Sequence, residues 1–87
     1  MHLVYILKSK KNGRYYIGST NNLQRRLKEH KLGKSLYTKN LRPWELVFSQ
    51  KYAKSKEAKK IEYKLKRLKR KDIIEQIIKD QKIKMAA

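Results

Sequence analysis

Residues 4–20 of this 87-residue chain read VYILKSKKNGRYYIGST, and they contain two short apolar runs, residues 4–7 and 15–20, on either side of Asn12-Gly13. β-Branched and aromatic residues favour strands, and an Asn-Gly pair between such runs favours a type I′ turn because both residues tolerate a positive φ. The sequence therefore predicts that the chain opens with a β-hairpin.

The predicted hairpin brings two tyrosines onto one face. Side chains alternate along a strand, so Tyr5 and Tyr16 are expected on the same face with Gly18 between them. A two-residue turn would pair Tyr5 with Thr20 and separate the tyrosine Cα atoms by roughly 13 Å along the strands. A wider loop is needed if both phenols are to reach one site. Strand tyrosines also serve as ordinary core residues, so their shared face is what favours a functional role.

Composition limits the class of protein. The chain carries 25 Lys and Arg against 7 Asp and Glu, a formal net charge of +18. Such a charge attracts polyanions and makes nucleic acid the first candidate partner, with strongly salt-dependent binding. The sequence has no Cys, which excludes disulfides and thiolate metal sites. We expect a cytoplasmic protein without a membrane partner, since no signal segment and no apolar run of about 20 residues is present.

A first helix and a third strand follow the hairpin. Asn21 is predicted to cap a helix that runs to roughly Leu32, with Gln24 at the reciprocal capping position and Gly33 at its end. Residues 33–43 show no periodicity and are expected to form a loop. The alternation over residues 44–52 predicts a strand beside the hairpin.

Two more helices are predicted from apolar residues at helical spacing. Ser55 is expected to cap the second helix, and the tail from Lys79 onward is expected to fray. The apolar positions are Ala58, Ile61, Leu65 and Leu68 in the second helix and Ile73, Ile74, Ile77 and Ile78 in the third. The predicted fold is thus α/β (α+β), a three-stranded antiparallel sheet packed against about three helices, in one domain over residues 1–87 with a core at about 2–68 and a C-terminal helix at about 71–82.

The first predicted helix carries two adjacent arginines that should differ in role. Helical residues step by about 100°, which places Arg26 and His30 on the side that faces the sheet. Arg25 and Glu29 fall on the opposite face at i,i+4 spacing, as in a solvated salt pair. A cation near a buried face needs an anionic partner, and Glu62 or a bound phosphate are the candidates. His30 has an alternative interpretation as a partly buried structural histidine.

Glu62 is predicted at the margin of the apolar stripe of the second helix. A carboxylate there is costly unless it is paired or holds a metal. One interpretation is an i,i+4 pair with Lys66. The other is a site for Mg²⁺, which takes few protein carboxylates and completes its ligands with water and substrate phosphate. Glu57 lies in the first turn, where it complements the helix dipole.

Together, VYIL and YYIGST resemble the paired signature of the GIY-YIG nuclease superfamily. Residues 22–30 are similar to that family's helix with an Arg followed by a His, and residues 56–66 resemble its metal-binding helix. The resemblance covers residues 2 to about 68 and extends to the small stand-alone bacterial members and to the nuclease domain of the excinuclease ABC system. Leu3 stands where the name-giving Gly would be, a change that removes no functional group.

The resemblance implies a metal-dependent endonuclease that hydrolyses phosphodiester bonds in DNA, with a role in DNA repair or processing. It implies that Glu62 holds Mg²⁺ or Mn²⁺, that Arg26 neutralises the developing charge, and that Tyr5, helped by His30 and the metal, activates the attacking water. Tyr16 would position the phosphate. The family leaves the general base open between the tyrosines and a neighbouring group.

Binding to nucleic acid should use further basic and aromatic residues. The expected contacts are Lys34, Tyr37, Arg42 and Lys66. The expected partner is DNA that is branched, damaged or single-stranded, and the sequence leaves RNA open. The alternative function is a basic nucleic-acid-binding protein that cuts slowly or not at all. The full set of candidate catalytic residues favours the enzyme, because binding alone would not require them.

Overall fold

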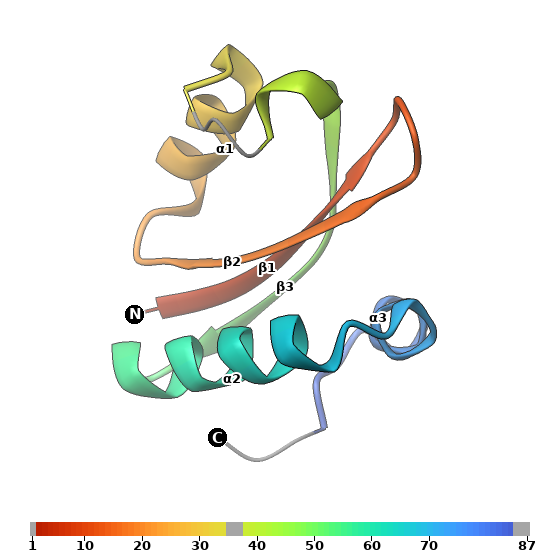
Figure 1. Ribbon diagram of the computed structural model, residues 1–87. Coiled ribbons are helices and arrows are strands. Elements are labelled where there is room, and N and C mark those ends of the chain that lie inside the picture. Colours follow the sequence, from red (N-terminus) through yellow and green to blue (C-terminus); the bar gives the residue numbers. More distant parts are fainter. Residues whose placement is uncertain (1, 35–37, 85–87) are drawn as a thin grey trace.

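The structure is a computed structural model that describes residues 2–34 and 38–84. The elements are β1 (His2–Ser9), β2 (Tyr15–Thr20), α1 (Leu23–Leu32), the 3₁₀ turn η1 (Lys39–Leu41), β3 (Trp44–Tyr52), α2 (Ser55–Leu68) and α3 (Lys71–Asp80). The strands form an antiparallel sheet in the order β2-β1-β3, with α1 on its upper face and α2 and α3 on its lower face (Figure 1). This arrangement confirms the predicted fold class. Within residues 2–34 and 38–84, no helix is long and apolar enough to cross a membrane.

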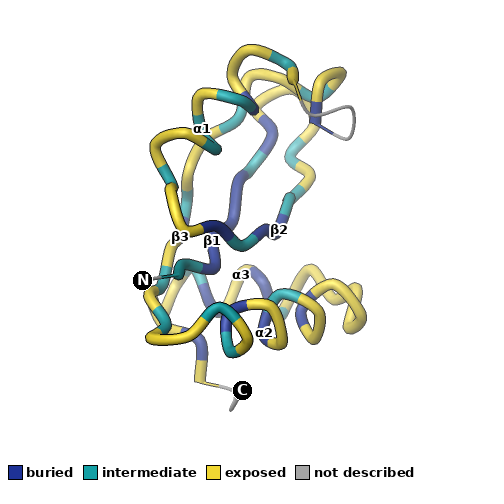
Figure 2. The backbone as a smooth tube through the Cα atoms, turned by 90° about the vertical axis from the view of Figure 1, so that its left-hand side faces the viewer, coloured by how far each residue is buried: buried dark blue, intermediate teal, exposed yellow. Residues whose placement is uncertain are grey.

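The central strand β1 is buried on both faces (Figure 2). Val4 and Ile6 pack in the core against α2 and α3, whereas Tyr5 belongs to the opposite face and lies against His30 of α1. The core of the lower face is completed by Ile17, Phe48, Ala58, Ile61, Leu65, Ile74, Ile77 and Ile83. The period-2 alternation thus assigns one face of the sheet to a hydrophobic core and leaves polar groups on the other.

The hairpin loop differs from the prediction. Tyr5 pairs with Gly18 and not with Thr20, because residues 10–13 form a four-residue loop closed by a 2.8 Å hydrogen bond from the Ser9 N–H to the Arg14 carbonyl. Gly13 has a positive φ of 76°, and Asn12 does not, so the predicted type I′ turn was wrong.

The wider loop has a local cause in Ser9. Its buried hydroxyl accepts hydrogen bonds from the N–H groups of Lys11 and Asn12 at 3.1 and 3.3 Å, and donates to the Leu41 carbonyl at 2.6 Å. These bonds satisfy backbone donors that a tight turn would have paired within the hairpin. The register moves by two residues, which preserves the predicted faces and shortens the separation of the two tyrosines along the strands.

Helix boundaries shift by one residue from the predicted caps. Asn22, not Asn21, caps α1 and accepts from the Arg25 N–H at 3.1 Å, and Gly33 ends the helix at φ 75° as predicted. Ser55 is the first residue of α2 rather than its cap. The Lys54 N–H before it donates to the Glu57 carboxylate at 3.2 Å, which gives Glu57 a capping role.

The described part of the C-terminal tail is anchored, which corrects the predicted fraying from Lys79. α3 continues to Asp80, and beyond it Ile83 is 4% exposed and joins the core. The Ile83 N–H donates to the Gln50 side-chain oxygen at 2.8 Å. A single isoleucine beyond the helix therefore fixes this segment against β3, and the helix is two residues shorter than predicted.

Candidate active site

Tyr5 lies at the centre of the upper face of the sheet, fully buried. Its hydroxyl is 3.0 Å from Nε2 of His30 on α1. The Tyr5 ring extends across the neighbouring strand at Gly18, where an added Cβ would lie 2.5 Å from the Tyr5 hydroxyl oxygen. Gly18 is therefore required for the position of this phenol, because any side chain there would displace it.

His30 is held between three polar groups. Its Nδ1 is 2.9 Å from the hydroxyl of the fully buried Thr38, and its Nε2 faces the Tyr5 hydroxyl and, at 3.5 Å, Nη2 of Arg26. Since Arg only donates hydrogen bonds, this network assigns the lone pair to Nε2 and the proton to Nδ1, which donates to Thr38. Tyr5 then donates to Nε2.

The protonation states agree with this assignment. Burial, reinforced by the nearby Arg26 charge, lowers the pKa of His30 to about 4, so the ring is neutral at pH 7. Burial also raises the pKa of Tyr5 to about 12, although hydrogen bonding with Arg26 acts in the opposite direction. In this structure Tyr5 is thus a protonated donor and His30 a neutral acceptor.

Arg26 faces the sheet as predicted, but its carboxylate partner differs from the expectation. Its Nη1 donates to Glu29 at 3.1 Å, so the predicted Arg25–Glu29 pair and the suggested Arg26–Glu62 pair are both replaced by an i,i+3 pair. Arg25 is exposed. Arg26 and Glu29 share the half-buried side of α1, where the two charges satisfy each other.

Glu62 approaches from the lower face of the sheet, on α2. Its Oε1 accepts from the Ser19 hydroxyl at 2.5 Å, and its Oε2 accepts from the Lys66 ammonium at 2.6 Å. The pairing of Glu62 with Lys66 is therefore present. The Lys66 ammonium also lies 5.5 Å from the centre of the Tyr16 ring, so Lys66 is placed beside the edge strand β2 between Glu62 and Tyr16.

One cavity of about 570 Å³ joins these residues at the edge of β2. Tyr5, Tyr16, Arg26 and Glu62 all line it, although they come from four different elements. His30 lies behind Tyr5, and its ring centre is 4.9 Å from that of Tyr16. The structure thus brings together all five residues for which the sequence suggested catalytic roles.

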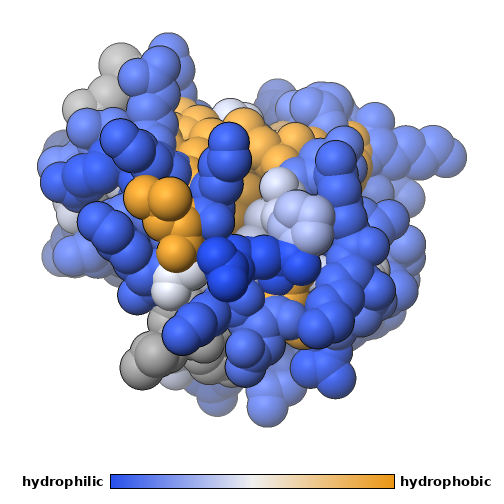
Figure 3. All heavy atoms as spheres, turned by 90° about the horizontal axis from the view of Figure 1, so that it is seen from above, coloured by the Kyte–Doolittle hydropathy of each residue, from blue (hydrophilic) through white to orange (hydrophobic). Residues whose placement is uncertain are grey.

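The residues predicted to contact nucleic acid are more scattered than the candidate catalytic residues. The face that carries α1 is mostly hydrophilic (Figure 3). Arg42, however, is engaged within the protein: its guanidinium donates to the carbonyls of Lys39 and Lys31 at 2.9 and 3.3 Å and so braces the end of α1. Lys34 is exposed beyond that end, and Lys66 adjoins Glu62. Tyr37 lies outside the described residues.

The groups near Glu62 fit a hard divalent cation that completes its ligands elsewhere. In the part of the chain that the structure describes, there is no cluster of three or more His, Cys, Asp or Glu side chains. An ionised carboxylate offers about four lone-pair positions, of which Ser19 and Lys66 engage one each. Magnesium and similar ions bind through one or two carboxylates together with water and substrate phosphates. Glu62 can therefore be the protein's ligand.

Two residues of the site were missed from the sequence. Thr38 orients His30 and Ser19 orients Glu62, both through a hydroxyl. Ser19 could have been noticed as a polar residue on the core-facing side of a strand, next to a carboxylate that needs a partner. Thr38 lies in an aperiodic stretch, where the sequence offers no signal.

A match to the GIY-YIG catalytic domain family covers residues 1–80, and the chain belongs to this family. The family is a nuclease superfamily whose enzymes are generally metal-dependent, which agrees with a cavity lined by the Glu62 carboxylate and the Arg26 guanidinium.

Bacterial relatives support the same assignment. The UPF0213 protein YazA of Bacillus subtilis is 44% identical over 71 residues, covering 80% of this chain and 71% of YazA. The UPF0213 protein CPE1444 of Clostridium perfringens is 39% identical over 85 residues, covering 97% and 89% of the two chains. The solution NMR structure of the UPF0213 protein BH0048 from Bacillus halodurans superposes with a TM-score of 0.56 at 36% identity, covering 87% of this chain and 81% of that one. None of these three names states an activity.

Proposed function

We propose that this protein is a metal-dependent endonuclease that hydrolyses phosphodiester bonds in DNA. The observation that carries the proposal is the convergence of Tyr5, Tyr16, Arg26 and Glu62 from four elements onto one cavity. A protein that only bound nucleic acid through charge would not need a phenol, a guanidinium and a carboxylate around one space.

Arg26 is the group that would stabilise charge on the phosphate. Burial opposes its charge, but the hydrogen bond with Tyr5 and the Glu29 carboxylate outweigh that effect, so the pKa of Arg26 lies above its usual value. The guanidinium therefore stays positive. Its N–H groups can donate to the non-bridging oxygens, where negative charge develops during hydrolysis.

Tyr5 and His30 would move the proton of the attacking water. The Tyr5 hydroxyl donates to His30 Nε2 and its oxygen accepts from Arg26, which leaves one oxygen lone pair for a water that donates to it from the cavity. As the water oxygen bonds to phosphorus, its proton passes to the Tyr5 oxygen and the Tyr5 proton passes to His30 Nε2. The bond between phosphorus and the leaving oxygen breaks, and the leaving oxygen takes a proton from solvent water. Thr38 holds the His30 tautomer that this transfer requires.

Glu62 is the residue that would hold the metal, with Ser19 fixing its orientation. When bound, Mg²⁺ or Mn²⁺ would supply positive charge at the scissile phosphate and its leaving oxygen. Lys66 occupies one Glu62 oxygen in this structure, and Tyr16 lies beside it to contact the phosphate. The proposed substrates are branched, damaged or single-stranded DNA, because a phosphate freed from a regular duplex can approach the buried phenol more closely.

The proposal is tested with supercoiled plasmid and with branched and single-stranded oligonucleotides, incubated in Mg²⁺ or Mn²⁺ and in EDTA, with an RNA strand in parallel. We expect cleavage of DNA that EDTA abolishes. Glu62→Gln should remove cleavage while preserving the fold and DNA binding, and Glu57→Gln on the same helix is the matched control. Cleavage by Glu62→Gln at the parental rate would refute the metal assignment. Tight DNA binding without cleavage of any substrate in either metal would favour the alternative, a non-catalytic nucleic-acid-binding protein.

A further inference from the structure

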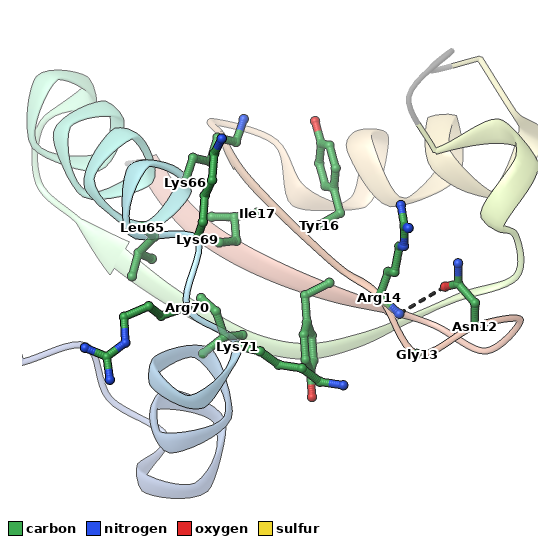
Figure 4. A pocket seen from close by; sticks show the side chains of 12 residues that line it. Asn12, Gly13, Arg14, Tyr16, Ile17, Leu65, Lys66, Lys69, Arg70 and Lys71 are labelled. Carbon is green, nitrogen blue, oxygen red and sulfur yellow. Dashed lines mark hydrogen bonds between the residues drawn. The ribbon is translucent and has the colours of Figure 1, made fainter.

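A second cavity opens next to the catalytic one, between the β1–β2 hairpin and the junction of α2 with α3 (Figure 4). Lys66 and Lys69 rise on the α2 side, Arg14 and Tyr16 lie on the hairpin side, and Lys71 comes from the start of α3. We refer to this cavity as the basic groove.

The walls of the basic groove are positively charged. Five cationic side chains line it and no carboxylate does; they are Arg14, Lys66, Lys69, Arg70 and Lys71. Lys66 is paired with Glu62, and Arg70 with Asp72 at 2.7 Å. The side chains of Arg14, Lys69 and Lys71 have no hydrogen bond or ion pair among residues 2–34 and 38–84. Three cations around one hollow are thus available to an anionic ligand.

The floor of the basic groove is apolar and includes an aromatic ring. Ile17, Leu65 and Ile74 form its base, and Tyr15 is half-buried beside them. A planar base can stack on an aromatic side chain whatever its sequence. In a duplex the base faces are already stacked on one another, so a floor of this kind can contact only a nucleotide that has left the helix.

The basic groove adjoins the catalytic cavity at Tyr16. Tyr16 lines both cavities, and Lys66 of the groove holds the Glu62 carboxylate of the catalytic cavity. A strand whose phosphate lay against Tyr5 and Arg26 would therefore pass Tyr16 and enter the groove with its next nucleotides.

We propose that the basic groove binds an unpaired DNA segment adjacent to the scissile phosphate. Tyr15 would stack on one base, and Arg14, Lys69 and Lys71 would contact the phosphates beside it. This inference rests on the proposed nuclease function and narrows its substrate class to DNA with a single-stranded segment next to the cleavage site.

The test measures binding of the full chain in EDTA, by fluorescence anisotropy, to a duplex and to the same duplex with a single-stranded extension. Arg14→Ala combined with Lys71→Ala removes two groove cations. Lys56→Ala combined with Lys60→Ala removes the same charge from α2 residues that do not line the groove. Both pairs are exposed, so the fold should be retained.

We expect parental protein to prefer the extended DNA, and the groove pair to lose about tenfold more affinity for it than for the plain duplex. The control pair of substitutions should lower the affinity for both DNAs by the same factor. Tyr15→Leu should cost at least about fivefold on the extended DNA alone, with thermal unfolding as a check on its packing. Equal losses from the groove and control pairs on both DNAs, or a parental preference for the plain duplex, would overturn the proposal. Because no metal is present, a failure of cleavage in the nuclease assay does not alter this readout.

Discussion

Arg25 and Arg26 are neighbours in the sequence, yet the pitch of α1 gives them different environments. Both line the cavity, but Arg26 reaches to within 3.5 Å of His30 Nε2 and is paired with Glu29, whereas Arg25 is exposed. A single step of about 100° around the helix separates a candidate catalytic donor from a surface cation.

The two arginines can be separated by substitution. We expect Arg26→Ala to lower the cleavage rate by ~10² or more, as the loss of a preorganised transition-state donor does. Arg25→Ala removes the same charge and should have only a small effect on DNA binding. Single-turnover rates and binding affinities of both variants provide the comparison, and equal losses of rate would contradict the placement of Arg26.

His30 should make folding stability depend on pH. Its pKa in the folded protein is about 4, below the ordinary value of 6.5, because burial and Arg26 oppose the charged ring. The unfolded chain therefore binds the proton more readily than the folded one. The contribution of neutral His30 to the free energy of unfolding is fully present above pH 6.5 and is lost as the pH falls towards 4. This loss is at most on the order of 3 kcal/mol.

The measurement is the free energy of unfolding in denaturant at several pH values from 7 to 4, for the parent, His30→Gln and His2→Gln. The slope between pH 6.5 and 4 should be reduced in His30→Gln and retained in His2→Gln. Carboxylates also titrate in this range, so the difference between the two variants is the informative quantity. Parallel pH profiles for all three proteins would show that His30 is not held neutral by the fold.

At the scale of elements, the hairpin explains how far the sequence can predict the site. Alternation predicted that Tyr5 and Tyr16 share a face, and this held because the predicted two-residue loop and the observed four-residue loop place the same residues on each face. The register was missed because the loop length depends on the hydrogen bonds that the Ser9 hydroxyl accepts from the loop N–H groups and donates to the distant Leu41 carbonyl. Local sequence does not contain that contact.

The hairpin also provides a direct test of how Tyr5 is positioned. Gly18→Ala would bring a Cβ to 2.5 Å from the Tyr5 hydroxyl oxygen. We expect a loss of about 1–3 kcal/mol of stability from overpacking, together with at least a tenfold fall in cleavage rate at unchanged DNA affinity, because the phenol must move.

Gly13→Ala is the matched control for that prediction. Gly13 has open space around it but a φ of +76°, so the substitution should cost about 1 kcal/mol of backbone strain and leave cleavage of folded protein unchanged. Thermal unfolding and single-turnover cleavage distinguish the two glycines. Parental cleavage by Gly18→Ala would mean that the Tyr5 position does not matter for chemistry.

The helices were the most predictable elements, and their connections the least. Apolar residues at helical spacing identified α2 and α3 and their buried sides, because a helix that covers a sheet needs an apolar stripe to pack against it. Leu68 is the exception: it was predicted in the stripe of α2 but is 42% exposed at the end of the helix. Ile83 and Thr38 were not assigned roles, since each acts through one long-range contact from a segment without periodicity. The predicted partner of Arg26 was wrong for a related reason. Glu29 is three residues from Arg26 and four from Arg25, so either pair can form on a helix, and only the packing of α1 decides between them.

For the whole molecule, the site depends on the complete fold. Arg26 comes from the helix above the sheet and Glu62 from the helix below it, and they meet at the edge strand β2 (Figure 1). No short segment contains the site. The family resemblance allowed its residues to be identified from the sequence. Their common location at the edge strand follows from the order of strands in the sheet.

The net charge of +18 leads to a prediction about binding. Affinity for duplex DNA should fall steeply and linearly with salt on a log-log plot, with little dependence on base sequence, because phosphate contacts release counterions. Titrations of anisotropy on several duplexes, at a series of salt concentrations in EDTA, provide the test. Tight binding to one sequence that salt does not weaken would contradict an electrostatic mode of binding.

The central claim is that Arg26 and Glu62 act on the same phosphate in one hydrolytic site. Its most direct test is the single-turnover cleavage rate, in saturating Mg²⁺ or Mn²⁺, of the parent, Arg26→Ala, Glu62→Gln and the double variant. Residues that act as a unit are strongly non-additive. We therefore expect measurable cleavage by the parent, a loss of ~10² or more in each single variant, and a double variant little slower than the worse single one. No cleavage by the parent in either metal, or single losses that simply multiply in the double variant, would contradict the claim.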